Sequence, residues 1–558
     1  MSRSSARCWA LAAAVATVWA CAGASSDRKT LDEELSQARS RLGVGIATDT
    51  SRSVRATGTR RLETVIPASP LRGAGGLACH ESQIYVAEPL VDRLSSVRAD
   101  GTVGRIGTPH GFRHPTDLAF DEHGVLYVAT AEAGGVWRRQ PGGTRWDRIG
   151  PGLSDLRGII VAQSGDLIAA ECARGGRLLR LDAGDGSLLE VLATSLGCPG
   201  RLSQDDDGTL LVPLRENGKV VAIDPRTKAT TVLAEGIDIP AATGRAPDGA
   251  RIVLESGSGK IRTLPEAGKQ GLSLASLPPG IADFVVCGET VVLSNEATGS
   301  LRAFKPWPSA SRMLVPSGLV LPGGIIFDGQ DLIVADRASI KRIRDGKIEL
   351  LVLARFDGMP PPVGLAGGLP GIVWITAPQE GELLQVDLRR GEATRIASGL
   401  DWPTSVLRTL GGDLVIAETG AGRVVRLGLG AVPYTLASGL MSPVALATRG
   451  ERILAAEPDG GRVLRIRPDE APTVVASELA GPAGLTTARG KPLYIAEERK
   501  GTLLMRSRDG TEHRVVEGLA LRTKRGGRPL PVPIAIGSDG SVVIASPENG
   551  SVVRVWPY

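Results

Sequence analysis

The chain has few aromatic residues and little net charge. Phe, Trp and Tyr make up 3% of its 558 residues, and the formal net charge is +5 at pH 7. A nucleic-acid-binding surface needs clustered basic residues and often aromatic side chains on which bases can stack. The basic residues here are dispersed along the sequence. We therefore expect no nucleic-acid partner, and instead a monomer that binds a protein or a small molecule.

Beyond its first residues the chain also lacks long apolar runs. The apolar stretch 9–20 follows Arg3 and Arg7 and is too short to span a bilayer comfortably. This order of charge and hydrophobicity is typical of an export signal, which we assign to residues 1–24. No other stretch is long enough to form a membrane helix. We expect the membrane to be involved only through a lipid anchor.

Two fates of this segment are open. Cleavage after Ala22 or Ala24 would release a secreted, soluble protein. Alternatively, the sequence Val-Trp-Ala-Cys at 18–21 resembles a bacterial lipobox, with Cys21 as the lipidated residue. The favoured localisation is a periplasmic or outer-membrane lipoprotein of the bacterial envelope. Residues 25–61 are expected to form a tether, in which 31–42 make a short amphipathic helix that ends at Gly43.

A repeat of about 42 residues fills the rest of the chain. Each unit has a buried second strand such as LVIA at 414–417, preceded by a Gly or Asp-Gly turn, and many first strands follow a proline. Four short strands at this period predict the blades of a β-propeller. The residues that end the second strands are Glu88, Thr130, Glu171, Leu214, Glu255, Asn295, Asp336, Ala377, Glu418, Glu457, Glu497 and Ser546.

The best copies carry a resemblance to a known group. The segments LPGGIIFDGQDLIVADRASIKRI (321–343) and GPAGLTTARGKPLYIAEERKGTLLMR (481–506) resemble NHL repeats and the six-bladed propellers of the SMP-30/gluconolactonase and virginiamycin B lyase type. The likeness covers residues 62–558. It implies an all-β fold of two tandem six-bladed propellers, with the first ring at 62–308 and the second at 309–558.

The ring closures can also be predicted. Residues 62–66 look like a fourth strand without its first three, and the last blade at 533–556 lacks a fourth strand. We expect 62–66 to complete the blade at 280–305, and the strand Met313–Pro316 to complete the blade at 533–556. Each ring would then be fastened by its own first strand.

The residues that end the second strands share one face of each ring and could hold a metal ion. Carboxylate and amide oxygens suit Ca²⁺ or Mg²⁺. The alternative is that each residue caps its own hairpin by accepting a backbone hydrogen bond. The metal segments that gluconolactonases carry are not recognisable in this sequence. The candidate ligands are Glu88, Glu171, Glu255 and Asn295 in the first ring, and Asp336, Glu418, Glu457 and Glu497 in the second.

Histidine offers few candidates for catalysis. The five histidines include one close pair, His110 and His114, in a loop on the face that carries Glu88. Histidine at such a place can act as a general base or bind a metal. The alternative is a pair of solvated loop residues, so no catalytic residue is assigned.

Four cysteines follow the export signal, and none form a Cys-x-x-Cys pair, which argues against a zinc site. Cys172 and Cys198 project from neighbouring blades to the same face, so an exported chain could join them in a disulfide. Cys79 and Cys287 could pair across the ring closure or remain two small buried residues.

One loop is longer than its counterparts and basic. The segment 521–533 carries Arg522, Lys524, Arg525 and Arg528, which could bind an anionic partner above an acidic channel mouth or remain solvated.

Three functions are left open. The leading one is a non-catalytic binding or assembly module, and the second is a metal-dependent lyase or lactonase-like hydrolase. Sugar binding would need an aromatic platform. The tryptophans that could supply it, at 137, 146, 307, 374 and 402, are scattered.

Overall fold

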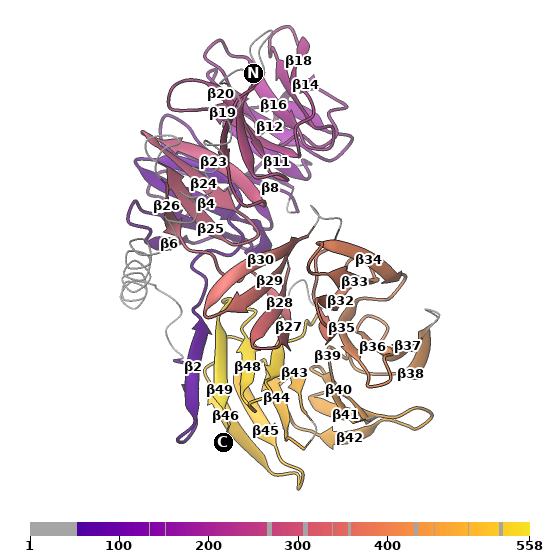
Figure 1. Ribbon diagram of the computed structural model, residues 1–558. Coiled ribbons are helices and arrows are strands. Elements are labelled where there is room, and N and C mark those ends of the chain that lie inside the picture. Colours follow the sequence, from indigo (N-terminus) through magenta and orange to yellow (C-terminus); the bar gives the residue numbers. More distant parts are fainter. Residues whose placement is uncertain are drawn as a thin grey trace, which may run out of the picture. The chain divides into compact units, whose positions relative to one another are not determined.

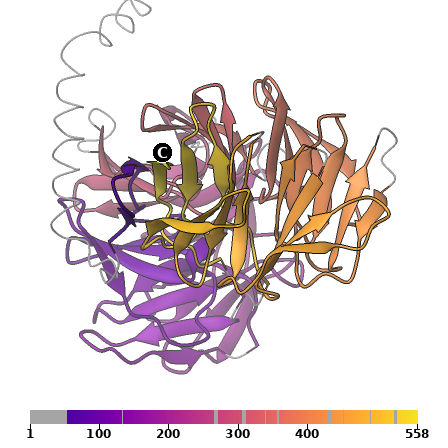
Figure 2. The ribbon, with the colours of Figure 1, turned by 90° about the horizontal axis from the view of Figure 1, so that it is seen from below.

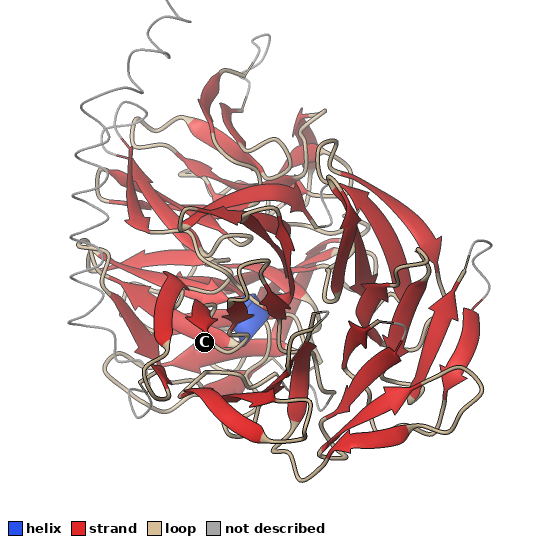
Figure 3. Cartoon of the chain, turned by 60° about the horizontal axis from the view of Figure 1, so that its bottom comes forward, coloured by secondary structure: helices blue, strands red, loops and turns tan. Residues whose placement is uncertain are grey.

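The protein folds into twelve antiparallel β-sheets that form two six-bladed propellers in tandem (Figure 1). The computed structural model describes residues 53–557, with gaps at 133, 151, 265–270, 305–310, 338, 355–358, 429–432, 451, 489 and 524–527. The one helical turn of the described residues is the 3₁₀ segment η1 (Pro89–Val91), and all other regular structure is strand (Figure 3). The expected export signal, Cys21 and the tether helix lie outside the described residues.

The first ring contains blades 1 to 6, with four consecutive strands each. Blades 1 to 3 consist of β3 (Leu77–His80), β4 (Gln83–Glu88), β5 (Arg93–Val97), β6 (Val103–Ile106); β7 (Pro115–Phe120), β8 (Leu126–Thr130), β9 (Gly135–Arg139), β10 (Asp147–Ile149); β11 (Leu156–Val161), β12 (Leu167–Glu171), β13 (Arg177–Leu181) and β14 (Leu188–Ala193). Blades 4 to 6 consist of β15 (Ser203–Gln204), β16 (Leu210–Leu214), β17 (Lys219–Ile223), β18 (Thr230–Ala234); β19 (Pro240–Arg245), β20 (Arg251–Glu255), β21 (Lys260–Thr263), β22 (Ser273–Ser276); β23 (Ile281–Cys287), β24 (Thr290–Asn295), β25 (Ser300–Phe304) and β26 (Ser311–Val315).

The second ring contains blades 7 to 12. Blades 7 to 9 consist of β27 (Pro322–Asp328), β28 (Asp331–Asp336), β29 (Ser339–Arg344), β30 (Lys347–Leu353); β31 (Leu365–Leu369), β32 (Ile372–Ala377), β33 (Glu382–Asp387), β34 (Glu392–Ala397); β35 (Pro403–Arg408), β36 (Leu414–Glu418), β37 (Arg423–Leu427) and β38 (Pro433–Ala437). Blades 10 to 12 consist of β39 (Ala445–Arg449), β40 (Arg452–Glu457), β41 (Arg462–Ile466), β42 (Thr473–Ala476); β43 (Pro482–Thr486), β44 (Leu493–Glu497), β45 (Thr502–Arg506), β46 (Glu512–Glu517); β47 (Ile534–Ile536), β48 (Val542–Ala545), β49 (Val552–Trp556) and β2 (Arg61–Ile66).

Burial follows the position of a strand in its blade. Every residue of the second strand β36 is buried, whereas the first three residues of the fourth strand β38 are exposed. The apolar side chains of neighbouring blades pack into shared clusters, such as the one that joins Tyr127 of blade 2 to Leu167 of blade 3. The core therefore lies between the blades, which explains why a single repeat could not fold alone.

The first ring closes between blades 6 and 1. The side chain of Asp283 on β23 accepts a hydrogen bond from the backbone N–H of Leu77, with the two atoms 2.8 Å apart. The Ser294 hydroxyl donates to the carbonyl of Gly75 at 2.6 Å. A disulfide between Cys79 and Cys287 joins the first strands of the same two blades. A second disulfide joins Cys172 to Cys198, so all four cysteines of the described residues are paired.

The prediction for how the strands close the rings was wrong. Strand β2 pairs with β49 and completes the last blade of the second ring, and β26 pairs with β25 within blade 6. Figures 1 and 2 show the indigo N-terminal strand beside the yellow C-terminal strands. Counting strands could not separate the two arrangements, because exchanging the two fourth strands gives the same number of complete blades.

The segment that leads from β2 to blade 1 is held by several hydrogen bonds. Ser69 donates two hydrogen bonds, from its N–H to the Asn549 carbonyl at 2.9 Å and from its hydroxyl to the Leu319 carbonyl at 2.7 Å. The buried Arg72 donates to the Val320 carbonyl at 2.7 Å and to the carbonyls of residues 547 and 548. Ahead of β2, strand β1 (Arg55–Ala56) adds a fifth strand to blade 11 by pairing with β46.

Candidate functional site

The carboxylates that end the second strands are buried and paired within their own blades. Glu88 is 0% exposed and accepts hydrogen bonds from Arg93 at 2.7 Å, from the Ser95 hydroxyl at 2.5 Å and from the backbone N–H of Arg72 at 2.6 Å. One side chain thus joins its own hairpin to the segment that enters the blade. A buried carboxylate is tolerable only with such partners.

The same cap recurs along the chain. Glu418 accepts from Arg423 at 2.5 Å and from the backbone N–H of Asp401 at 2.8 Å. Asp336 accepts from Lys341 at 2.6 Å, with both side chains fully buried. The other caps pair Glu171 with Arg177, Glu255 with Arg262, Glu457 with Arg462, and Glu497 with Thr502.

These caps account for seven of the eight residues that the sequence offered as metal ligands. Among the residues that the structure describes, no three His, Cys, Asp or Glu side chains gather closely enough to hold a metal ion. Each carboxylate already has a cation or hydroxyl and, in most blades, a backbone N–H. A divalent cation at such a place would have to displace an arginine or lysine or, at Glu497, a threonine hydroxyl from the carboxylate.

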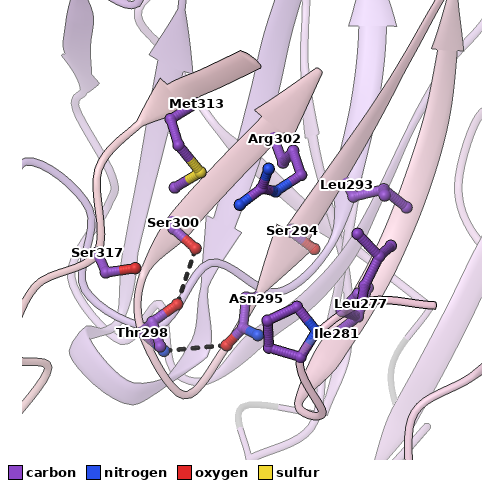
Figure 4. Close-up of a pocket in the computed structure, with 11 residues that line it drawn as sticks. Leu277, Ile281, Leu293, Ser294, Asn295, Thr298, Ser300, Arg302, Met313 and Ser317 are labelled. Carbon is purple, nitrogen blue, oxygen red and sulfur yellow. Dashed lines mark hydrogen bonds between the residues drawn. The ribbon is translucent and has the colours of Figure 1, made fainter. Parts of the chain in front are cut away.

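The eighth residue, Asn295 of blade 6, makes a different cap. Its side-chain oxygen accepts from the N–H of Thr298 at 3.0 Å, and its amide donates to the Pro279 carbonyl at 3.1 Å. Asn295 lines a pocket of about 80 Å³ together with Ser300 and Arg302 (Figure 4). The remaining lining residues are Leu277, Pro278, Ile281, Leu293, Ser294, Thr298, Met313 and Ser317.

A charged cluster that the sequence did not reveal lies at the inner strands of the first ring. The guanidinium of Arg201 is 2.7 Å from the carboxylate of Asp283 and 3.4 Å from that of Asp117. It also donates to the Thr116 carbonyl. Arg201 enters blade 4, whereas Asp117 and Asp283 belong to blades 2 and 6. One side chain therefore links three alternate blades across the middle of the ring.

Burial changes the acid–base behaviour of this cluster. Desolvation raises the pKa of Asp117 to about 7, although Arg201 works against the rise and Asp283 adds to it. Burial likewise raises the pKa of Asp283, opposed by Arg201 and by the backbone N–H of Leu77. Asp117 also accepts from the N–H of Ile159 at 2.9 Å. The cluster can hold one proton near neutral pH.

The repeat contained a signal for this cluster. The inner positions of blades 1 to 6, which lie opposite the next-to-last residue of each second strand, are Gly76, Asp117, Gly158, Arg201, Ala242 and Asp283. Charged and small residues alternate. A Cβ on Gly76 would lie 2.5 Å from the Thr116 carbonyl oxygen and 2.8 Å from the Arg201 guanidinium, so the small residues make room for the arginine. The second ring has only uncharged residues there: Gly324, Gly364, Ser405, Ala445, Gly484 and, opposite the last residue of β48, Pro533.

Of the two loop histidines, His114 alone is enclosed. Its ring nitrogen Nδ1 is 3.7 Å from Glu132, and its backbone N–H donates to Asp92 at 2.8 Å. Desolvation lowers the pKa of His114, and the charges that act on it come from several blades, Glu296 of blade 6 foremost. His110 is exposed. The structure therefore separates the pair into one partly buried and one solvated side chain.

The basic loop is described only in part, since Lys524 and Arg525 lie outside the described residues. Arg522 is exposed, and the Arg528 guanidinium lies 4.7 Å from the centre of the Trp402 ring. Two of the other tryptophans, Trp137 and Trp374, are buried in the core, so they cannot form a sugar platform.

Comparison with known proteins gives only distant likenesses. No protein-family model and no curated protein match this chain. The extracellular domain of a one-component system from B. thetaiotaomicron aligns with 86% of this chain and 75% of its own, at 11% identity and a TM-score of 0.31. A gluconolactonase-like protein aligns with 48% of this chain and 99% of its own, at 13% identity and a TM-score of 0.37. Neither likeness bears on the activity of this chain.

Proposed function

We propose that the protein is an exported, double-propeller binding or assembly module without catalytic activity. The observation that carries this proposal is that the carboxylates at the ends of the second strands cap their own hairpins. The rim carboxylates are each committed to an arginine, a lysine or a hydroxyl of the same blade, as in the bonds of Glu88 to Arg93 and Ser95. Groups that are neutralised by their own hairpin stabilise the fold and leave little capacity to bind a metal or move a proton.

Two further features support a binding role. Arg201 pairs with Asp117 and Asp283 from two other blades of the first ring, so these buried charges are committed to one another. The pocket beside Asn295 has about 80 Å³, whereas substrate and drug sites usually have about 300–1,000 Å³. The protein would then use its surface to engage a partner.

Export is part of the proposal. The two disulfides of the first ring suit an oxidising compartment outside the cytoplasm. No helix within the described residues is long and apolar enough to cross a membrane. We propose lipid attachment at Cys21, with release of a soluble protein as the alternative. A Cys21→Ser variant that stays with the membrane fraction would argue against the anchor.

A second function, a metal-dependent lyase or lactonase-like hydrolase, is favoured by His114. Desolvation lowers the pKa of its imidazole, which favours the neutral form that could accept a proton from a substrate. Its neighbourhood also includes carboxylates from more than one blade. In this function a Ca²⁺ or Mg²⁺ ion would have to displace a paired cation such as Arg93 from Glu88, and His114 would supply the base.

One experiment separates the two functions. The purified protein would be incubated with a panel of lactones and unsaturated-uronide precursors, with EDTA or with added Ca²⁺, Mg²⁺, Mn²⁺ or Zn²⁺. In parallel, a photo-crosslinking residue would replace the exposed His110 in living cells. We expect no turnover and a discrete crosslinked protein. Turnover that disappears in His114→Ala, but persists in His123→Ala, would replace the binding role with an enzymatic one.

A further inference from the structure

Blade 6 has the arginine of a cap, Arg302, but no carboxylate at the position that ends its second strand. In blade 5, Glu255 faces Lys260 across the hairpin, and Arg262 stands two residues further along β21. In blade 6, Asn295 faces Ser300, and Arg302 stands two residues further along β25. The registers are the same. Arg302 therefore occupies the position of Arg262, and Asn295 occupies that of Glu255.

The two arginines differ in their partners. The Arg262 guanidinium is 2.7 Å from the carboxylate of Glu255. Arg302 donates to the Ser311 hydroxyl at 3.2 Å, and among the described residues no carboxylate lies within ion-pair distance of it. A guanidinium gains about twice as much from a charged acceptor as from a neutral one. Arg302 is thus a cation with a weak partner.

Other blades without the carboxylate restore the balance of charge. In blade 4, Leu214 takes the place of the acid, and Lys219 opposite pairs with Glu235 at 2.6 Å. In blade 8, Ala377 takes the place of the acid. The residue opposite is Glu382, which pairs with Arg395 at 2.9 Å. Blades 2 and 12 have neutral residues at both positions. Among the described caps, blade 6 is the one that keeps an arginine at the position of Arg262 and has no carboxylate for it to pair with.

The missing side chain leaves a pocket. Asn295 and Ser300 are shorter than the glutamate and lysine of blade 5, and both line the space together with Arg302 (Figure 4). The hydroxyls of Thr298 and Ser300 are 2.8 Å apart at the polar end. Leu277, Leu293 and Met313 supply apolar walls. One cation, hydroxyl donors and aliphatic walls are the features that recognise a short aliphatic acid.

We propose that this pocket binds a short-chain aliphatic carboxylate, of the acetate to butyrate class, whose carboxylate replaces the absent glutamate. The carboxylate accepts from Arg302 and from the hydroxyl pair, and the alkyl chain lies against Leu277 and Met313. The inference goes beyond the binding role proposed above and does not rest on it. The loss of a macromolecular partner would leave this pocket intact, and failure of this pocket would leave the partner.

The test uses the purified full chain with acetate, propionate and butyrate as probes. Titration by calorimetry or by ligand-observed NMR should give dissociation constants on the order of 1 mM, as expected of ligands with so few atoms. Acetamide and butyramide, which lack the charge, should bind at least about tenfold more weakly. Inorganic phosphate should compete poorly because it has no alkyl chain. Equal affinity for the amides, or binding of phosphate alone, would overturn the proposal.

Variants locate the site. Arg302→Gln should lower the affinity at least about tenfold, whereas Arg312→Gln, one strand away and bonded to the Ala99 carbonyl, should leave it unchanged. Retention of affinity in Arg302→Gln would contradict the assignment.

A pair of matched substitutions at Asn295 tests the idea of a missing acid without any ligand. Asn295→Glu and Asn295→Gln add the same volume, but only glutamate supplies a carboxylate to Arg302. Both should abolish binding of butyrate. Asn295→Glu should unfold at a higher temperature than Asn295→Gln, and the difference should shrink in high salt. Equal unfolding temperatures of the two variants at low salt would show that Arg302 gains nothing from a carboxylate at position 295.

Discussion

Ile66 faces Val552 across the pair of strands β2 and β49, so a strand from the beginning of the described region completes the last blade. The second ring is closed by hydrogen bonds between segments from opposite ends of the chain. The first ring is closed between its last and first blades by the Asp283 bond to Leu77 and by a disulfide. The two rings therefore depend on different features for closure.

The closing strand predicts a local effect of mutation. Thr64→Pro removes a backbone donor from β2 and should disrupt its pairing with β49, where Thr64 faces Val553. Hydrogen exchange followed by mass spectrometry should show lost protection in β47 to β49 and little change in β23 to β26. Arg55→Pro, in the short additional strand β1, serves as the control and should affect β46 alone. Loss of protection in β23 to β26 instead would contradict the observed closure.

The caps predict unequal effects of removing glutamates. Glu457→Gln weakens a buried, charge-assisted bond to Arg462, and Glu457 also accepts from the Met441 N–H at 2.6 Å. We expect a loss of about 1–3 kcal/mol in the free energy of unfolding. Glu470→Gln, in an exposed pair with Arg467, should cost less than about 1 kcal/mol. Chemical denaturation checks both values, and equal losses would argue against a structural role for the caps.

The buried cluster predicts that stability falls as the pH rises. The pKa of Asp117 is raised from 3.8 to about 7, so the native state binds a proton that the unfolded chain has released between these values. The contribution of Asp117 is fully present below pH 4 and is lost as the pH rises towards 7, by up to about 1.4 kcal/mol per pH unit. Asp117→Asn should have a shallower slope between pH 5 and 7. Parallel curves for the two proteins would contradict the raised pKa.

Arg201 should matter more than either of its partners. Arg201→Met leaves Asp117 and Asp283 buried without their cation, which we expect to cost about 3–5 kcal/mol near neutral pH. The loss should be smaller at pH 4.5, where at least one of the two carboxyls is protonated. Thermal unfolding at the two pH values measures the difference. A loss that is independent of pH would indicate that Arg201 acts through packing alone.

The fold could be predicted from the sequence because the repeat is local. Strands such as LVIA at 414–417 and the turns before them are encoded within a few residues. Because the unit occurs twelve times, an ambiguous strand in one copy can be assigned from the others. The exchange of β2 and β26 could not be predicted, because strand counts and spacing are the same for both arrangements. Only the packing of whole blades decides between them.

The candidate site was predicted less well, for two reasons. The repeat places Glu88 and its counterparts on one face, but the partners that neutralise them, such as Arg93, lie on the next strand and meet them only when the hairpin forms. Asp117, Arg201 and Asp283 come from blades far apart in sequence, and their contact depends on the diameter of the ring. Comparing inner positions between blades would have revealed the alternation of charged and small residues.

The most direct measurement is the thermal unfolding of the purified protein in EDTA and then in Ca²⁺, Mg²⁺, Mn²⁺ or Zn²⁺. If the rim carboxylates are caps held by their own arginines and lysines, no cation should raise the unfolding temperature of the wild-type protein. A metal that binds only the native state and is present at about 100 times its Kd would add roughly 2.7 kcal/mol to the free energy of unfolding. A rise in the unfolding temperature with one cation, abolished by Glu88→Gln, would contradict a non-catalytic double propeller and favour the metal-dependent enzyme.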